Sequence, residues 1–224
     1  MISEKEETQA ILPSEAVLAV IASFLLTLFL GAAFTIFVSY GLSMVLGELL
    51  IMIVPFGYML SKKVNVKKYI GLKINLKTIS LGIAIGVLLL FLDIIVTDVM
   101  VLIFGPSEVV EESNKVITEM AGSTEGLIWV TTALTLAGIC EEFTFRGFLQ
   151  TAINSKYPLP VALLASSLAF GFVHFDPQAV YTISAFLIGL VLGYVYHHWR
   201  SYTVAATAHA TLNLIILALT VLIS

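Results

Sequence analysis

Four side chains in the C-terminal half of the sequence carry the chemistry that hydrolysis of an amide bond requires. They are Glu141, His174, His209 and Asn213, and they stand in three separate apolar stretches. A Glu and a His can together hold and deprotonate a water molecule, and a second His with an Asn amide can donate hydrogen bonds to a developing oxyanion. This set predicts hydrolysis by an activated water, without a nucleophilic side chain.

Glu141 opens the stretch EEFTFR, in which three charges fall within six residues. Glu142 and Arg146 are four residues apart, so on a helix they share one face and can form an ion pair. Glu141 is rotated by about 100° from Glu142 around the helix, so Arg146 cannot easily serve both carboxylates. We therefore predict that Glu142 and Arg146 lock the helix, and that Glu141 is left to act as a general base.

Two other chemistries would use some of the same residues. Glu141, His174 and His209 could bind a divalent metal such as zinc, with water as the open ligand. Because the sequence lacks HExxH, such ligands would have to come from different helices. Cys140 adjoins Glu141, but a single buried cysteine is usually a small apolar residue, and we do not expect it to be the nucleophile. The residue types leave the metal question open.

The segments that must position these residues are typical of membrane helices. Of the 224 residues, 59% are hydrophobic and 12% are charged, whereas soluble domains are about half apolar and about a quarter charged. Several apolar runs exceed the ~20 residues needed to cross a bilayer. The predicted fold is an all-α polytopic transmembrane bundle of about seven spans, at 15–38, 42–60, 79–104, 127–154, 159–175, 178–198 and 203–223. We also expect Phe170 with His174, and His209 with Asn213, to form i,i+4 pairs on helices.

Charge in two polar loops predicts the orientation of the bundle. The loop 61–78 contains six lysines, and the loop 105–126 is acidic. Because Lys and Arg in short loops stay in the cytoplasm, we place 61–78 and the N-terminus inside, and 105–126 and the C-terminus outside. Hydrolysis needs water, so we expect a cavity that opens toward the cytoplasmic half. Tilted or long helices must then bring His209 level with the deeper Glu141 and His174.

Taken in order, three motifs resemble those of the CPBP intramembrane proteases, which include type II CAAX prenyl endopeptidases and bacterial relatives linked to bacteriocin processing or self-immunity. The motifs are EExxxR at Glu141, Glu142 and Arg146, FxxxH at Phe170 and His174, and HxxxN at His209 and Asn213. The resemblance covers about residues 125–217. We therefore expect a CPBP-like catalytic core at 125–217 and N-terminal spans and loops at 1–124, within one membrane domain.

The resemblance also implies a role for each motif residue. Glu141 would activate water with His174 as its partner, His209 and Asn213 would stabilise the oxyanion, and the other three motif residues would support the site. The implied activity is hydrolysis of a peptide bond near the cytoplasmic membrane face, in a peptide or a prenylated protein. Both a metal-dependent and a glutamate-based mechanism are described for this family, so the resemblance does not decide whether a metal is required.

Two other classes of function fit a membrane protein with a polar core. A non-catalytic bacteriocin self-immunity protein would use the motif residues structurally. A small proton-coupled transporter would use intramembrane acids such as Glu48, Asp93 and Asp98, although the sequence shows no paired repeats with broken helices. No Lys/Arg-rich stripe with interleaved aromatics indicates nucleic-acid binding. The expected partners are thus the lipid bilayer and a peptide or protein substrate, and the sequence predicts no oligomeric state.

Overall fold

A computed structural model describes residues 11–223, and every regular element in this range is helical. The absence of strands from the described residues confirms the predicted all-α class. The elements in chain order are α1 (Pro13–Phe37), α2 (Tyr40–Ser61), α3 (Val66–Tyr69), α4 (Leu76–Phe104), α5 (Glu108–Ala121), α6 (Thr124–Glu142), the π-helix η1 (Phe143–Gln150), α7 (Thr151–Asn154), α8 (Leu159–Val173), α9 (Val180–Trp199) and α10 (Tyr202–Ile223).

Within residues 11–223, six helical segments are long and apolar enough to cross a membrane. One of them runs from Thr124 to Asn154 and contains α6, η1 and α7. The apolar helix α8 has 15 residues, which extend over about 22 Å, whereas the hydrocarbon core of a bilayer is about 30 Å thick. Six predicted spans are therefore confirmed, and the one predicted at 159–175 is a shorter helix.

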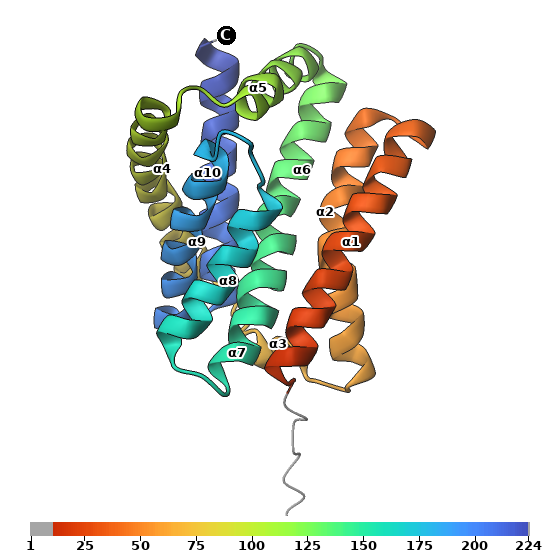
Figure 1. Ribbon diagram of the computed structural model, residues 1–224, viewed down its shortest axis with the longest axis vertical. Coiled ribbons are helices and arrows are strands. Elements are labelled where there is room, and N and C mark those ends of the chain that lie inside the picture. Colours follow the sequence, from red (N-terminus) through yellow and green to blue (C-terminus); the bar gives the residue numbers. More distant parts are fainter. Residues whose placement is uncertain (1–10, 224) are drawn as a thin grey trace, which may run out of the picture.

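The long helices and α8 lie side by side, and with α8 included they alternate in direction along the chain (Figure 1). The pair α1 and α2 packs against α6 and η1, and α10 packs against α4, α6 and α9. The loop that contains α3 lies at one end of the bundle, here called the lysine-rich end, and α5 lies across the opposite end, here called the α5 end (Figure 1). The two loops that predicted the orientation thus lie at opposite ends. The predicted cytoplasmic N-terminus falls in residues 1–10, outside the described residues.

A proline in α2 leaves one backbone carbonyl without its helical hydrogen bond, and hydroxyl groups of two other helical segments donate to this carbonyl instead. Pro55 has no N–H, so the carbonyl of Ile51, four residues earlier, loses its helical partner. Ser23 of α1 donates to this oxygen at 2.6 Å, and Thr144 of η1 donates to it at 2.9 Å. An unpaired carbonyl is costly in an apolar environment, and these two bonds therefore tie α1 and η1 to α2.

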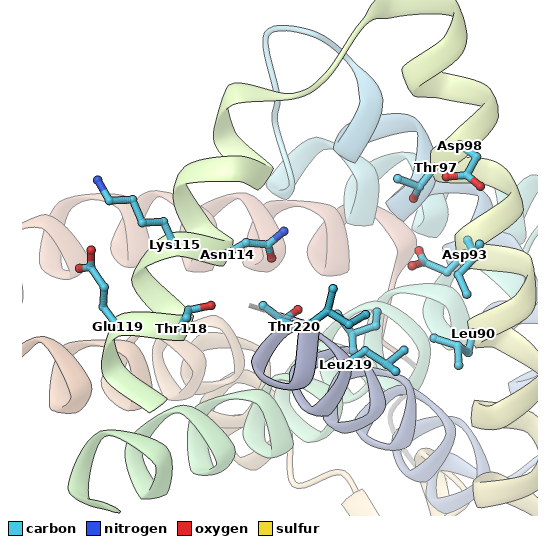
Figure 2. Close-up of a pocket in the computed structure, with 13 residues that line it drawn as sticks. Leu90, Asp93, Thr97, Asp98, Asn114, Lys115, Thr118, Glu119, Leu219 and Thr220 are labelled. Carbon is cyan, nitrogen blue, oxygen red and sulfur yellow. The ribbon is translucent and has the colours of Figure 1, made fainter. Parts of the chain in front are cut away.

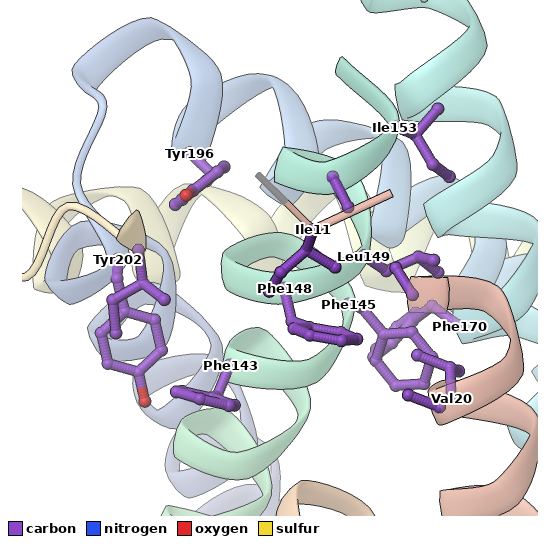
Figure 3. Packing of buried hydrophobic residues seen from close by; sticks show 14 of the residues in the cluster. Ile11, Val20, Phe143, Phe145, Phe148, Leu149, Ile153, Phe170, Tyr196 and Tyr202 are labelled. Carbon is purple, nitrogen blue, oxygen red and sulfur yellow. The ribbon is translucent and has the colours of Figure 1, made fainter. Parts of the chain in front are cut away.

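The π-helix η1 was not predicted, since the pattern indicated one regular helix over 127–154. All eight of its residues are buried. The ring of Phe143 packs edge-on against Tyr202 at 6.3 Å between centroids, and Phe145 packs in the same way against Phe170 at 5.4 Å (Figure 3). A π-helix has hydrogen bonds between residues i and i+5; it is rare in proteins and frequently occurs at functional sites. The segment that follows Glu141 and Glu142 is thus a π-helix with every residue buried.

Helices α6 and α10 approach each other closely because Gly138 has no side chain. A Cβ at this position would lie 2.5 Å from the backbone nitrogen of Ala210 and 2.8 Å from its Cα. These are backbone atoms, which cannot move aside without moving α10. Gly138 lies three residues before Glu141, and Ala210 directly follows His209. The close approach of α6 and α10 therefore sets the distance between Glu141 and His209.

We expect Gly138→Ala to lower the free energy of unfolding by about 1–3 kcal/mol, the usual cost of overpacking. The matched control is Gly57→Ala in α2, where an added Cβ has nothing within 4 Å. Thermal unfolding of both variants in detergent micelles measures the difference. Equal unfolding temperatures for the two variants would contradict the close approach of α6 and α10.

Candidate active site

Glu141 lies at the end of α6, with its side chain buried between two histidines. Its Oε1 atom is 3.9 Å from Nε2 of His174, and its Oε2 atom is 3.8 Å from Nε2 of His209. Both separations exceed hydrogen-bond distance and leave room for a bridging group such as a water. The fold therefore brings together three ionisable residues that are far apart in the sequence.

The second ring nitrogen of each histidine indicates its tautomer. Nδ1 of His174 is 2.8 Å from the backbone oxygen of Phe170, which can only accept, so this Nδ1 carries the hydrogen. Nδ1 of His209 is 3.1 Å from Oε1 of Glu142 and donates to that carboxylate. Each Nε2 is then an acceptor in the neutral ring and a donor only in the protonated ring. Both Nε2 atoms face Glu141.

Glu142 and Arg146 form the ion pair that their spacing predicts. Arg146 Nη1 is 2.9 Å from Glu142 Oε1, and neither side chain is exposed. Nη2 of Arg146 also donates to the backbone oxygen of Gly189 at 3.1 Å, and the guanidinium carbon lies 4.3 Å from the centre of the Phe170 ring. Buried pairs need such added contacts to compensate for lost hydration. The sequence did not predict that Glu142 would also contact His209 and so link the first motif to the third.

His174 follows the last residue of α8 and is not on the helix itself. Its backbone has φ −98° and ψ 39°, outside the helical region. The predicted i,i+4 pair with Phe170 is nevertheless in contact, with ring centroids 4.6 Å apart. Phe170 also packs edge-on against His209, with centroids 5.7 Å apart. Phe170 thus contacts both histidines and the guanidinium group.

The loop after α8 fixes the position of His174. Thr182 donates from its hydroxyl to the carbonyl of His174 at 3.0 Å and accepts from the backbone nitrogen of Asp176 at 2.9 Å. The carboxylate of Asp176 accepts from the backbone nitrogen of Tyr181 at 2.9 Å. Pro177 disfavours a helical conformation at Asp176, so the chain leaves the helix here and is held by the start of α9.

Two residues near Glu141 lie outside the predicted motifs. The ring of Tyr181 packs edge-on against His174 with centroids 5.0 Å apart, and Tyr181 interacts electrostatically with Glu141. Glu48 of α2 also interacts electrostatically with Glu141. The sequence indicated Glu48 as an intramembrane acid but did not indicate its role. Tyr181 gave no signal, because its approach to His174 depends on the fold of the intervening loop.

Helix α10 begins inside the bundle, which brings His209 level with Glu141. Its first residue, Tyr202, is buried and donates from its hydroxyl to the backbone oxygen of Ile139 in α6 at 2.8 Å. Ile139 lies two residues before Glu141, so the side chain of the first residue of α10 reaches the vicinity of the candidate site. This start of α10 explains why His209 lies level with Glu141, although its position in the sequence predicted a shallower depth than that of Glu141 and His174.

His209 and Asn213 line one cavity of about 340 Å³ together with Phe170 and His174. Asn213 donates from Nδ2 to the backbone oxygen of Leu134 at 3.2 Å. An amide group has two hydrogens, so one bond to Leu134 leaves a second donor. The cavity thus gathers residues of the second and third motifs beside Glu141.

This cavity extends toward the α5 end. It is also lined by Asp93 and Thr97 of α4 and by Asn114 of α5. The same three residues line a second, wider hollow of about 660 Å³ between α4, α5 and α10 (Figure 2). We call the two joined hollows the α5 groove. The predicted opening toward the lysine-rich end is therefore wrong, because the cavity at the motif residues leads to the opposite end.

The arrangement does not support the predicted metal set. Among residues 11–223, no group of three or more His, Cys, Asp or Glu side chains is placed to hold a metal ion. The Glu141 oxygens are instead 3.8–3.9 Å from the two histidine Nε2 atoms. Each Nδ1 is already bonded to another protein oxygen.

Residues 123–215 match the family model described as Rce1-like, type II CAAX prenyl endopeptidase. This segment contains all seven motif residues and makes up less than half of the chain. The match confirms the family resemblance predicted from the three motifs. The six long apolar helices among the described residues support an integral membrane protein. No protein with a curated description and no solved structure matches the chain.

We expect Arg146→Met to lower the free energy of unfolding of the protein by about 3–5 kcal/mol, because Glu142 would stay buried without its cation. The double variant Glu142→Gln/Arg146→Met should recover much of this loss. Lys62→Met is the control, since it removes the partly exposed pair with Glu15, for which about 1 kcal/mol or less is expected. Thermal unfolding in micelles compares the variants, and equal losses for the single and double variants would argue against an ion-pair effect.

Proposed function

We propose that the protein is an intramembrane endopeptidase that hydrolyses a peptide bond with a water activated by Glu141 and His174. The observation that supports this most directly is the 3.9 Å separation of the Glu141 carboxylate from Nε2 of His174, beside a cavity. The family match over residues 123–215 supports the same class of reaction. The roles of the individual residues rest on their geometry.

A water held between Glu141 and His174 would donate one hydrogen bond to the carboxylate and the other to the neutral Nε2. Nε2 is an acceptor here because Nδ1 of His174 donates to Phe170. The water oxygen attacks the substrate carbonyl carbon while one proton moves to Glu141, which gives a tetrahedral oxyanion. Glu141 then passes this proton to the departing amine as the C–N bond breaks. One water is consumed, and the products are an amine and a carboxylic acid, which then releases its proton to water and becomes a carboxylate.

His209 and Asn213 would stabilise the oxyanion. Asn213 offers the amide hydrogen that is not bonded to α6. His209 can donate from Nε2 only when it is protonated, because its Nδ1 hydrogen is directed to Glu142. Protonated His209 also balances the charge of the cluster, since it and Arg146 carry two positive charges against the carboxylates of Glu141 and Glu142. This role therefore requires the imidazolium form.

The α5 groove is the route by which we expect the substrate to reach Glu141. Polar side chains of α4 and α5, including Asp93 and Asn114, face apolar residues of α10 such as Leu219 (Figure 2). A peptide backbone needs hydrogen-bond partners, and an apolar chain needs apolar contact. The groove offers both, which suits a peptide or a prenylated protein, the substrate class implied by the family.

The decisive experiment is peptide cleavage by the purified protein in detergent, with prenylated and unprenylated peptides. Glu141→Gln and His174→Ala should each lower the rate by about 10²–10⁴-fold, the usual contribution of a general base. Glu112→Gln, on the exposed surface of α5, is the charge-matched control and should cleave normally. Full cleavage by Glu141→Gln would overturn the mechanism. Capture of uncleaved peptide by this variant, identified by mass spectrometry, would reveal the substrate sequence.

Access through the α5 groove is tested by narrowing it. Thr220 of α10 lines both hollows of the groove, so Thr220→Trp should raise KM by about tenfold or more through displacement of the substrate. Thr132→Trp on the exposed side of α6 adds the same bulk outside the groove and should leave KM unchanged. Similar KM values for both variants and the unmodified protein would place the substrate route elsewhere.

A further inference from the structure

A third pocket lies at the lysine-rich end, outside the candidate active site. Its volume is about 450 Å³, and its lining includes three cationic side chains, Lys68, Lys73 and Arg200. Hydroxyl and amide groups from η1, α7 and α9 complete the lining, and no described residue that lines it is acidic. The pocket therefore concentrates positive charge and hydrogen-bond donors. We call it the basic pocket.

The cations of the basic pocket have no acidic partner within residues 11–223. Lys62 of the same loop pairs with Glu15 at 2.8 Å, whereas no ion pair forms at Lys68, Lys73 or Arg200. Like charges gathered in one pocket repel each other. Lys68, Lys73 and Arg200 are exposed, and a bound anion would offset their repulsion.

Backbone contacts hold the cations around the pocket. Arg200 has a left-handed backbone with φ 45°, a conformation that is unfavourable for a residue with a side chain. Gly71 lies directly against it, and a Cβ there would be 2.6 Å from the carbonyl oxygen of Arg200. Tyr202 donates from its backbone nitrogen to the oxygen of Gly71 at 3.3 Å, and Lys73 donates from its backbone nitrogen to Thr203 at 3.3 Å. The lysine-rich loop and the α9–α10 turn are thus joined beside Arg200, where the local strain is consistent with a binding function.

Neutral polar groups form the inner wall of the pocket. Thr151 donates from Oγ1 to the backbone oxygen of Arg146 at 3.1 Å, so the hydroxyl of Tyr196 donates to Thr151 at 2.8 Å. The hydroxyl of Tyr69 is buried and has no hydrogen-bond partner among the described residues. Burial raises the pKa of Tyr69 above its usual value, with a smaller contribution from Tyr196, so this phenol keeps its proton. A buried hydroxyl without a partner is unfavourable, and an acceptor oxygen in the pocket would satisfy it.

We propose that the basic pocket binds a phosphate group, which has several acceptor oxygens and negative charge. Arg, Lys and hydroxyl donors are the groups that recognise phosphate in proteins. The pocket lies at the end of a membrane-spanning bundle, where basic clusters bind the headgroups of anionic lipids. A soluble phosphate compound presents the same group from the aqueous side. This site is independent of the proposed peptidase reaction.

The test uses the full chain in detergent, with phosphatidylglycerol, phosphatidylcholine and inorganic pyrophosphate as separate probes. Native mass spectrometry measures the bound probe, and thermal unfolding measures stabilisation. We expect phosphatidylglycerol or pyrophosphate to bind in preference to phosphatidylcholine. Lys68→Gln/Lys73→Gln should weaken this binding by about tenfold or more, as expected for the loss of two basic residues near an anionic headgroup.

The matched control is Lys67→Gln/Lys77→Gln, which removes the same charge from the same loop at positions that do not line the pocket. It should bind the probes normally. Arg200→Asn is a further variant, since Asn tolerates a left-handed backbone and the change removes charge without added strain; it should also weaken binding. Stabilisation by phosphatidylglycerol alone assigns a lipid ligand, and stabilisation by pyrophosphate assigns a soluble one. Equal weakening in both double variants, or no preference for either anionic probe, would overturn the proposal.

Discussion

The buried ion pair between Arg146 and Glu142 is the interaction on which the rest of the polar core depends. A lone charge at this depth would be strongly unfavourable, and the pair has no exposed surface. Its contacts extend to the backbone of Gly189, to the ring of Phe170 and, through Glu142, to Nδ1 of His209. Five helical segments, α6, η1 and α8 to α10, therefore meet at one charge cluster. Any shift of these helices would separate charges that the apolar surroundings cannot solvate, which makes the arrangement stiff.

The π-helix η1 supplies buried polar side chains around this cluster, since all eight of its residues are buried. Thr144 donates to the backbone carbonyl that Pro55 leaves without a helical partner. Arg146 donates to the backbone oxygen of Gly189, and Gln150 donates to that of Gly193 at 2.9 Å. Gly189 and Gly193 are one turn apart on α9, and at both positions a Cβ would crowd a side chain of η1. The GxxxG spacing in α9 thus lets polar side chains of η1 reach the backbone of α9.

Much of this could be predicted from the sequence, and the exceptions have identifiable causes. Helix type and most spans follow from hydropathy, and the Glu142–Arg146 pair follows from helical spacing. The contact of Glu142 with His209 and the deep start of α10 at Tyr202 depend on how helices pack, which spacing within one segment does not encode. The π-helix has no compositional signal. The direction of the cavity was predicted wrongly because loop charge reports which end of the bundle stays in the cytoplasm, and it carries no information about where side chains leave space.

The surroundings of Glu141 and Glu142 explain why a membrane segment carries two adjacent carboxylates. Oε1 of Glu142 contacts both Arg146 at 2.9 Å and His209 at 3.1 Å. Glu141 has its two oxygens at 3.9 Å and 3.8 Å from the two Nε2 atoms, too far for direct hydrogen bonds. A carboxylate so placed can bind water or a substrate group, whereas Oε1 of Glu142 already holds two cationic or donor groups. In the proposed mechanism, Glu142 orients His209, and Glu141 remains available for an incoming molecule.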